Sequence, residues 1–290
     1  INTKVPQIFA ESAVAGDGTD WNPTELGILG DISIAVPVMI FDDGRHARPQ
    51  VHAEPFAGTL LFTPGALLCN GRGQQPVDMA EVTGPDGKIC PEGYYQLYER
   101  RLLPVLAHAD AAAAARGTMA VITIPGIGCG QFAGPFRGQL GAALQAVLEQ
   151  LLENHGAALP RIKAIYYDPY GECANLRREI HHITFMVRPL LHGNNDKPQL
   201  CRPPAYAEAG DDFSACELFS VVAWDHVSWP GNDYWAGSRC TDDGVKAAAT
   251  NTMAVITGID GHYDRAAAAY LPPEPFHTWD AVVRAHKLRL

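Results

Sequence analysis

A short apolar run in the last third of the chain ends abruptly, and the pattern of hydrophobic positions changes directly after it. Residues 218–224 (LFSVVAW) are apolar and rich in β-branched side chains, which predicts a buried strand. From residue 245 onward the apolar positions recur at helical spacing, so we expect a helix over residues 241–257 with Thr241 as its N-cap. The segment between the two is polar and aromatic, and we expect it to be a loop.

Other apolar runs along the chain predict further strands. Residues 32–41 are expected to form an edge strand or two short pieces, because Pro37 interrupts them. Three shorter runs have the continuous apolar character of buried strands. They are residues 58–63, 119–124 and 162–167, the last of which leads into Asp168.

Three stretches predict helices. Residues 94–116 end in five alanines before Gly117, and Pro104 is expected to kink or restart this helix. Apolar residues spaced along 140–151 mark an amphipathic helix that Gly156 closes. A last amphipathic helix is expected within residues 272–290.

The remaining segments are less regular. Residues 1–30 lack periodicity and are expected to lie irregularly over the surface, whereas residues 172–193 are expected to form a helix followed by a strand. We interpret His181 and His182 as a surface pair rather than metal ligands, because no H-E-x-x-H motif is present. No repeat and no long linker divides the chain, so we predict one α/β domain over residues 1–290 with an irregular N-terminal extension.

Composition and charge narrow the possible functions. The chain is 47% apolar and 19% charged, which is ordinary for a globular protein. A formal charge of −10 argues against binding nucleic acid or an anionic membrane surface, but not against a small anionic ligand. The seven cysteines are irregularly spaced without a C-x-x-C pair, so we expect reduced thiols in an intracellular, cytoplasmic protein. No stretch is long and apolar enough to predict a membrane span.

A glycine-rich segment separates the strand at 119–124 from the helix that follows it. Glycines allow the backbone to turn with positive φ and to approach a ligand closely, and N–H groups at a helix start attract anions. The order strand, glycine loop, helix therefore predicts a phosphate-binding loop over residues 126–132. A dinucleotide-binding Rossmann unit is set aside, because the acidic residue that it requires about twenty positions later is missing.

Aspartates gather in the loop between residues 224 and 243. Asp225 directly follows the predicted strand, and Asp233 stands in a Pro-Gly-Asn turn flanked by aromatic residues. Asp242 and Asp243 fall in the first turn of the predicted helix, where acids are favoured because they complement the helix dipole. Asp233 alone could be explained as part of a turn, and Asp242 and Asp243 as helix caps, but neither explanation covers Asp225. The carboxyl end of a strand, where Asp225 stands, is also where α/β proteins bind ligands. The aromatic residues between them could stack on a base, although core packing is expected for at least two of them. These are Trp224, Trp229, Tyr234 and Trp235.

Two motifs resemble the macrodomain family. The run VITIPGIGCGQFAGPFRGQL at residues 121–140 looks like the phosphate loop of macrodomains, and residues 224–257 resemble the MavL-like branch of ADP-ribosylhydrolases found among Legionella effectors. The resemblance implies a three-layer α/β/α sandwich with a mixed central sheet and insertions. It also implies three catalytic aspartates, Asp225, Asp233 and Asp243. We expect ADP-ribose to contact Thr63, Pro64, Gly65, Asn70, Gly126, Ile127, Gly128, Cys129, Gly130, Gln131, Phe132, Asn232 and Asp242.

The chain also departs from the patterns of this family. The early N-A-A-N-like loop is reduced to Asn70 and the neighbouring glycines, and Gln74 and Gln75 lack the glutamate of the polyglycohydrolase motif. Cleavage of poly(ADP-ribose) is therefore not expected. Asp31, in the sequence GDIS, is the candidate for the aspartate that contacts adenine in macrodomains.

The resemblance implies removal of mono-ADP-ribose from arginine side chains of modified proteins, with ubiquitin as one candidate, and an effector would act in a host cytosol. ADP-ribose and an arginine-linked protein are thus the expected partners, without nucleic acid, membrane, metal or cofactor. Two alternatives stay open. One is a reader that binds ADP-ribose without cleaving it, and the other is a metal-dependent phosphohydrolase in which the aspartates hold Mg²⁺.

Overall fold

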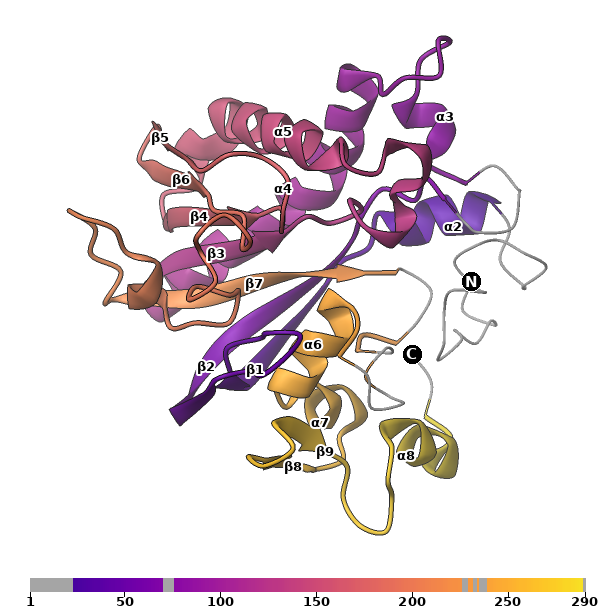
Figure 1. The fold of residues 1–290 in the computed structure, drawn as a ribbon, viewed down its shortest axis with the longest axis vertical. Coiled ribbons are helices and arrows are strands. Elements are labelled where there is room, and N and C mark those ends of the chain that lie inside the picture. Colours follow the sequence, from indigo (N-terminus) through magenta and orange to yellow (C-terminus); the bar gives the residue numbers. More distant parts are fainter. Residues whose placement is uncertain (1–22, 70–75, 226–228, 232–233, 235–238, 289–290) are drawn as a thin grey trace.

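A mixed seven-stranded sheet forms the centre of the protein, in the order β1-β2-β7-β3-β4-β6-β5 (Figure 1). The computed structural model describes residues 23–69, 76–225, 229–231, 234 and 239–288. The five inner strands run parallel, and an antiparallel strand closes each edge. The strands are β1 (Ile34–Asp42), β2 (Val51–Pro64), β3 (Met119–Pro125), β4 (Ile162–Asp168), β5 (Leu176–Ile180), β6 (Ile183–Val187) and β7 (Cys216–Trp224).

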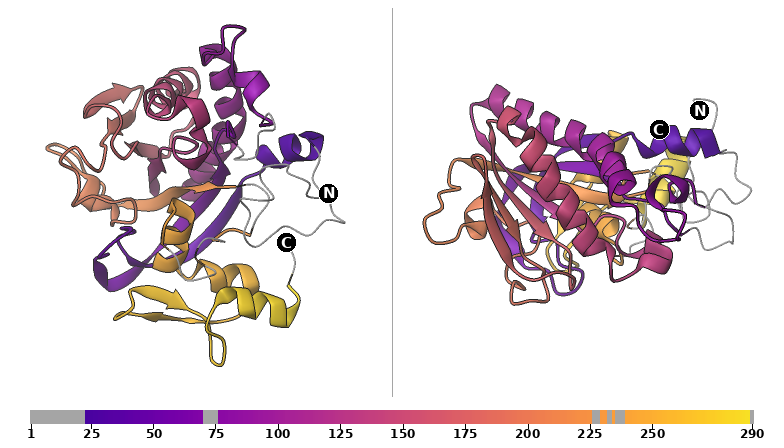
Figure 2. Two further views of the ribbon diagram at one scale, coloured as in Figure 1. Left: turned by 45° about the vertical axis from the view of Figure 1, so that its right-hand side comes forward. Right: turned by 90° about the horizontal axis from the view of Figure 1, so that it is seen from above.

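Helices cover both faces of this sheet (Figures 1 and 2). α4 (Pro91–Arg116) and α5 (Leu140–His155) pack on one face, whereas α6 (Asp242–Ala249) and α7 (Thr252–Thr257) pack on the other. The predicted macrodomain-like α/β/α sandwich is thereby confirmed. The other elements are α2 (Pro23–Gly30), α3 (Met79–Val82), α8 (Trp279–His286), the hairpin β8 (His262–Asp264) and β9 (Ala269–Leu271), and the short 3₁₀ helices η1 (Gln131–Phe136), η2 (Gly156–Ala158) and η3 (Pro203–Tyr206).

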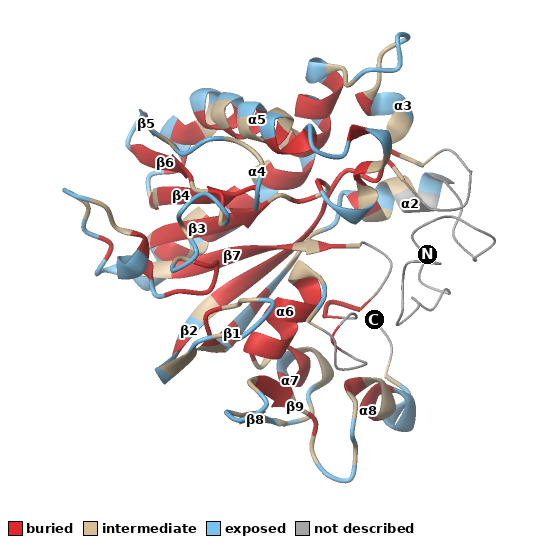
Figure 3. Ribbon diagram, viewed as in Figure 1, coloured by how far each residue is buried: buried red, intermediate tan, exposed pale blue. Residues whose placement is uncertain are grey.

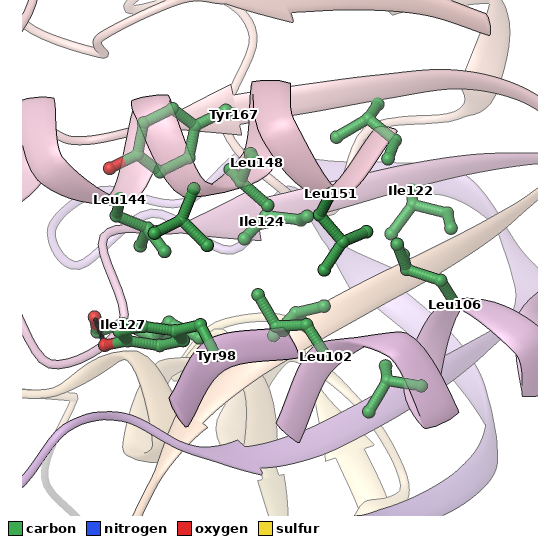
Figure 4. Packing of buried hydrophobic residues seen from close by; sticks show 14 of the residues in the cluster. Tyr98, Leu102, Leu106, Ile122, Ile124, Ile127, Leu144, Leu148, Leu151 and Tyr167 are labelled. Atoms are coloured by element: carbon green, nitrogen blue, oxygen red, sulfur yellow. Dashed lines mark hydrogen bonds between the residues drawn. The ribbon is translucent and has the colours of Figure 1, made fainter. Parts of the chain in front are cut away.

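β3, β6 and the second half of β2 are buried on both faces, which explains their continuous apolar runs (Figure 3). On one side, residues of α4 and α5 meet β3, as Tyr98, Leu102, Leu148 and Ile122 do in Figure 4. β1 instead alternates between exposed and buried positions, as an edge strand does, and it accommodates Pro37 without a break. The predicted edge strand is therefore continuous.

The predicted helix within residues 172–193 is wrong. Residues 176–187 form the antiparallel hairpin β5–β6, and His181 occupies its turn with a φ of 55°. Pairing with β6 overrides the helical tendency of the sequence, and Arg177 at the sheet edge forms ion pairs with Glu179 and Asp211. The predicted surface position of His181 and His182 is confirmed, because both are exposed.

The predicted helix 241–257 is two helices. Thr250 bridges to Ile40 of β1, and the Asn251 side chain accepts a hydrogen bond from the Met39 amide at 2.7 Å, so the chain is held out of helical geometry at this point. Residues 23–30 form α2 rather than an irregular extension, and residues 1–22 lie outside the described part of the chain. The last helix is shorter than expected and begins at Trp279.

α4 and α5 match their predicted positions closely. Pro104 is accommodated within a continuous α4, and Gly117 ends the helix with a φ of 70°, the left-handed conformation that glycine adopts most easily. Gly156 closes α5 as predicted, but it does so in right-handed geometry and leads into η2.

Candidate active site

The carboxyl ends of four neighbouring parallel strands share one edge of the sheet. Pro64 of β2 pairs with Trp224 of β7, and Thr123 of β3 pairs with Ser220 of β7. Pro125 at the end of β3 pairs with Asp168 at the end of β4. The segments that follow these strands therefore leave from the same edge, where open α/β sheets bind ligands. The glycine-rich loop (residues 126–132), which follows β3, and Asp225, which follows β7, therefore leave from neighbouring strands at this edge.

Close packing fixes the glycine-rich loop against α4 and the loop after β2. Gly128 has a φ of 75°, and a side chain there would begin 2.7 Å from the Tyr98 hydroxyl and 2.8 Å from the Ala66 nitrogen. That hydroxyl donates to the Ile127 carbonyl at 2.8 Å and accepts from the Ala66 amide at 3.1 Å. Tyr98 thus joins the two loops, and only glycine fits at position 128.

The glycine-rich loop turns its apolar side chains inward. Ile127 and Cys129 are buried, and burial raises the pKa of the Cys129 thiol well above its usual range. Gly130 and Gln131 are exposed, and the space beside Gly130 is open. A ligand above this loop would therefore meet its backbone and Gln131 rather than the side chains of 127 and 129.

The loop after β2 is the second predicted ligand-binding segment. Thr63, Pro64 and Gly65 are all buried, and Gly65 packs so tightly that a side chain would start 2.3 Å from the Gly128 nitrogen. Arg101 of α4 supports this loop, because it donates to the Gly65 carbonyl at 2.8 Å and pairs with buried Asp78 at 2.9 Å. The predicted residue Asn70 lies outside the described residues.

The first turn of α6 lies against the end of β7. Thr241 caps the helix as predicted, since its hydroxyl accepts from the Gly244 amide at 3.2 Å. The Asp242 carboxylate accepts from the Ala223 amide at 2.8 Å, and the Asp243 carboxylate accepts from the Gly231 amide at 2.7 Å. These contacts bring both aspartates to the end of the strand that Asp225 follows.

The predicted site residues differ in their exposure. Asp225 is partly exposed, the Asp242 side chain is 20% exposed, and Asp243 is buried. Asn232 and Asp233 lie outside the described residues, as does Trp235. Trp224, Trp229 and Tyr234 are buried, which confirms core packing for at least two of the four aromatic residues.

An ion pair anchors the far end of the acidic loop, which we define as residues 225–243. Arg239 donates to the fully buried Asp42 carboxylate at 2.9 Å and to the Ala268 carbonyl at 2.7 Å. The Tyr263 hydroxyl also donates to Asp42, at 2.8 Å. Among the described residues of this segment, Asp242 is thus held at β7 and Arg239 at the end of β1.

A buried polar network beneath this edge was not predicted. It consists of Asp168, Gln199, Asp242 and Lys246, and Lys246 is 1% exposed. Burial lowers the pKa of Lys246 and raises that of Asp168. The sequence contained one sign of this network. Lys246, four residues after Asp242 and directly before three alanines, is a charged residue at a position where the helix needs an apolar one.

Asp31, the candidate adenine contact, lies three residues before β1, whose first residue Ile34 pairs with Phe62 near the carboxyl end of β2. Its carboxylate pairs with Arg100 at 2.7 Å and Arg101 at 3.2 Å. It also lines a cavity of about 290 Å³ between β1, β2 and α4, together with Ser33 and His108. The carboxylate that was expected to meet adenine is thus engaged by two arginines.

Within the described residues, no group of three or more His, Cys, Asp or Glu side chains is placed to hold a metal ion. In the same part of the chain, no helix combines the length and apolar character that crossing a bilayer requires.

Comparison with known families adds to this geometry. The family described as "Macrodomain effector MavL" matches residues 1–276. The chain therefore belongs to the MavL macrodomain effector family, as the sequence motifs predicted, and this membership supports an ADP-ribose-binding, hydrolase-type macrodomain. No curated protein gives a significant match to the chain.

Proposed function

We propose that this member of the MavL macrodomain effector family is a hydrolase that removes mono-ADP-ribose from arginine side chains of modified proteins, ubiquitin being one candidate. The observation that carries the proposal is topological. The glycine-rich loop follows β3 and Asp225 follows β7, and these two strands are hydrogen-bonded neighbours that run in parallel. A pyrophosphate on the loop would therefore have the acidic loop beside it.

The two ends of the ligand would lie over different strands. The distal ribose would lie above β7, next to Asp225 and the first turn of α6. The adenosine would extend toward β4, where Tyr170 is 58% exposed and its amide is held by the Asp168 carboxylate at 2.8 Å. An exposed ring on this side of the loop offers a surface on which adenine can stack.

The chemistry of arginine release fits a cluster of carboxylates. Water attacks C1″ of the ribose, the C1″–N bond breaks, and the proton of the water passes to the guanidine nitrogen, which gives ADP-ribose and arginine. The transition state carries positive charge on the ribose, which a nearby carboxylate stabilises while another activates the water. Carboxylates also hold the guanidinium by charge-assisted hydrogen bonds. We assign these roles to Asp225, Asp233 and Asp243 as a group.

The decisive experiment offers the protein arginine-linked, serine-linked and glutamate-linked mono-ADP-ribosyl peptides and measures released ADP-ribose. We expect release from the arginine-linked peptide only. Asp225→Asn, Asp233→Asn and Asp243→Asn should each slow it by about a hundredfold or more. Asp86→Asn, at an exposed carboxylate in a turn, is the matched control and should keep full activity. Release from the serine- or glutamate-linked peptide alone would contradict the arginine specificity.

A non-catalytic reader is the second candidate, and one observation favours it. The Asp242 and Asp243 carboxylates already accept hydrogen bonds from the Ala223 and Gly231 amides, as structural carboxylates do. Calorimetry with ADP-ribose beside the turnover assay separates the two functions. Tight binding without release from any of the three peptides would establish the reader.

A further inference from the structure

Lys246 is a charged residue in a position where the helix needs an apolar one. It lies in the second turn of α6 and is 1% exposed, with Ala247, Ala248 and Ala249 buried directly after it. Burying an ammonium group costs free energy that even a good ion pair only partly recovers, so an apolar side chain of similar volume is often as stable. Fold stability alone therefore does not account for this lysine.

The Lys246 ammonium makes three hydrogen bonds, all to groups near the candidate active site. Its ammonium donates to the Asp242 carboxylate at 3.0 Å, to the Gln199 side-chain oxygen at 2.9 Å and to the Val221 carbonyl at 2.5 Å. Val221 follows Ser220, which is level with Thr123 in β3. The ammonium therefore lies just below the point at which the chain leaves β3 to form the glycine-rich loop.

The same network continues to the far side of that loop. The Gln199 side-chain nitrogen donates to Asp168 at 3.5 Å, and the Thr123 hydroxyl donates to the Gln199 carbonyl at 3.0 Å. Asp168 in turn accepts from the Tyr170 and Leu190 amides, each at 2.8 Å. One chain of polar contacts thus passes under the glycine-rich loop and connects the ends of β7, β3 and β4.

The charges of these side chains affect how an anionic ligand can bind at this edge of the sheet. Asp168 and Asp242 belong to the network, and Asp225 and Asp243 lie at the same edge of the sheet, so an approaching diphosphate meets several carboxylates. In a medium of low polarity, one buried positive charge near them offsets much of this repulsion.

We infer that Lys246 is a positioning residue whose buried ammonium offsets the charge of Asp242, so that a diphosphate can bind to the glycine-rich loop beside the acidic loop. The inference rests on the proposed function, because it takes the ligand to be ADP-ribose. Lys246 does not touch the ligand. It acts through Asp242 and through the electrostatic potential beneath the loop.

Two kinds of substitution that should change the affinity for ADP-ribose in opposite directions test this inference. Lys246→Met and Lys246→Gln should each weaken ADP-ribose binding about tenfold in calorimetry. Asp242→Asn should strengthen binding severalfold, because an asparagine oxygen can still accept from the Ala223 amide while the negative charge is gone. The double variant Lys246→Met/Asp242→Asn should return close to the wild-type affinity. Lys88→Met, at a lysine whose side chain is 82% exposed, is the matched control and should change nothing.

A merely structural lysine gives a different pattern, in which both Lys246→Met and Asp242→Asn weaken binding and the double variant is no better than either. That result overturns the inference while leaving the proposed function intact. Circular dichroism and thermal melting check that each variant is folded. If Lys246→Met does not fold, Asp242→Asn alone tests the inference. Weaker ADP-ribose binding by Asp242→Asn than by the wild type would contradict it. A wild-type protein that does not bind ADP-ribose at all would overturn both proposals.

Discussion

Asp42, Asp168 and Asp243 are all buried, yet their carboxylates meet different donors. Asp42 accepts from a guanidinium, a phenol and the Gly44 amide, Asp168 from two backbone amides and a glutamine, and Asp243 from the amide of Gly231. The Asp42 carboxylate balances the charge of a guanidinium, whereas burial raises the pKa of Asp168 and the hydrogen bonds from its amide donors only partly oppose this. Substitutions at Asp42 and Asp168 should therefore have different effects.

Asp42→Ala should destabilise the protein by about 3 kcal/mol, because it leaves the Arg239 guanidinium in a largely buried site without its carboxylate. Urea denaturation measures the free energy of unfolding. Activity should fall as well, since Arg239 anchors the end of the acidic loop. The matched control is Asp86→Ala, at a carboxylate that is 61% exposed, and it should cost less than about 0.5 kcal/mol. Equal costs at the two positions would contradict this account.

Asp168→Asn should change how stability depends on pH. Burial raises the pKa of Asp168 above its ordinary value of 3.8, so between 3.8 and the raised pKa the folded protein keeps a proton that the unfolded chain has lost. The contribution of Asp168 to stability is therefore present at low pH and lost as pH rises through this window. The asparagine has no such proton. Urea denaturation from about pH 3.5 to 7 should show wild-type stability falling relative to the variant as pH rises.

Asp211→Asn is the control for this slope. The hydrogen bonds from Arg177 lower the pKa of Asp211, so its contribution is present above 3.8 and lost as pH falls. The wild type should therefore lose stability relative to this variant on acidification, which is the opposite direction. Parallel pH profiles for the wild type and Asp168→Asn would show that Asp168 does not titrate as described.

At the scale of elements, the glycine-rich loop depends on α4 as much as on its own sequence. Tyr98→Phe removes a buried hydroxyl that bonds both to the Ile127 carbonyl and to the Ala66 amide. We expect a loss of about 1–3 kcal/mol in the free energy of unfolding and weaker ADP-ribose binding, because both loops lose a fixed contact. Urea denaturation and calorimetry measure the two effects.

Tyr166→Phe provides the matched control for Tyr98. Tyr166 is also buried, but within the described residues its hydroxyl has no hydrogen-bond partner. Its removal should leave both stability and ADP-ribose binding nearly unchanged. If Tyr98→Phe binds ADP-ribose as tightly as Tyr166→Phe does, the contact through Tyr98 does not matter for the loop.

The elements that sequence could predict are those with a local signal. The buried strands and α4, α5 and the N-cap Thr241 follow from apolar runs, helical periodicity and capping chemistry. The hairpin at 176–187 and the break at Thr250 depend on pairing with distant strands, which periodicity does not record. Within the candidate site, the glycine-rich loop and Asp225 were predicted from their neighbours in sequence, and their roles stay a prediction. The polar network was missed because Gln199 and Lys246 meet only in the folded chain.

At the scale of the whole molecule, topology brings distant segments together. Residues 126–132 and 225 are about a hundred positions apart in the sequence, and they follow neighbouring strands because β7 inserts between β2 and β3. The motif resemblance could imply this meeting, but no local pattern could. The two halves of the proposed site therefore depend on a long-range strand pairing, and the catalytic roles of the three aspartates remain a prediction.

The net charge of −10 leads to a last prediction about which modified proteins react fastest. A protein with this charge repels acidic substrates and attracts basic ones, and salt weakens both effects once the Debye length shortens to about 8 Å near 0.15 M. Raising the ionic strength from about 20 to 200 mM should therefore lower kcat/KM severalfold for an ADP-ribosylarginine peptide flanked by lysines. It should raise kcat/KM for the same peptide flanked by glutamates, and a peptide with neutral flanks should lie between them. Because the chemical step is the same in all three peptides, a common salt dependence would mean that encounter is governed by the diphosphate and the local acids rather than by the field of the whole molecule.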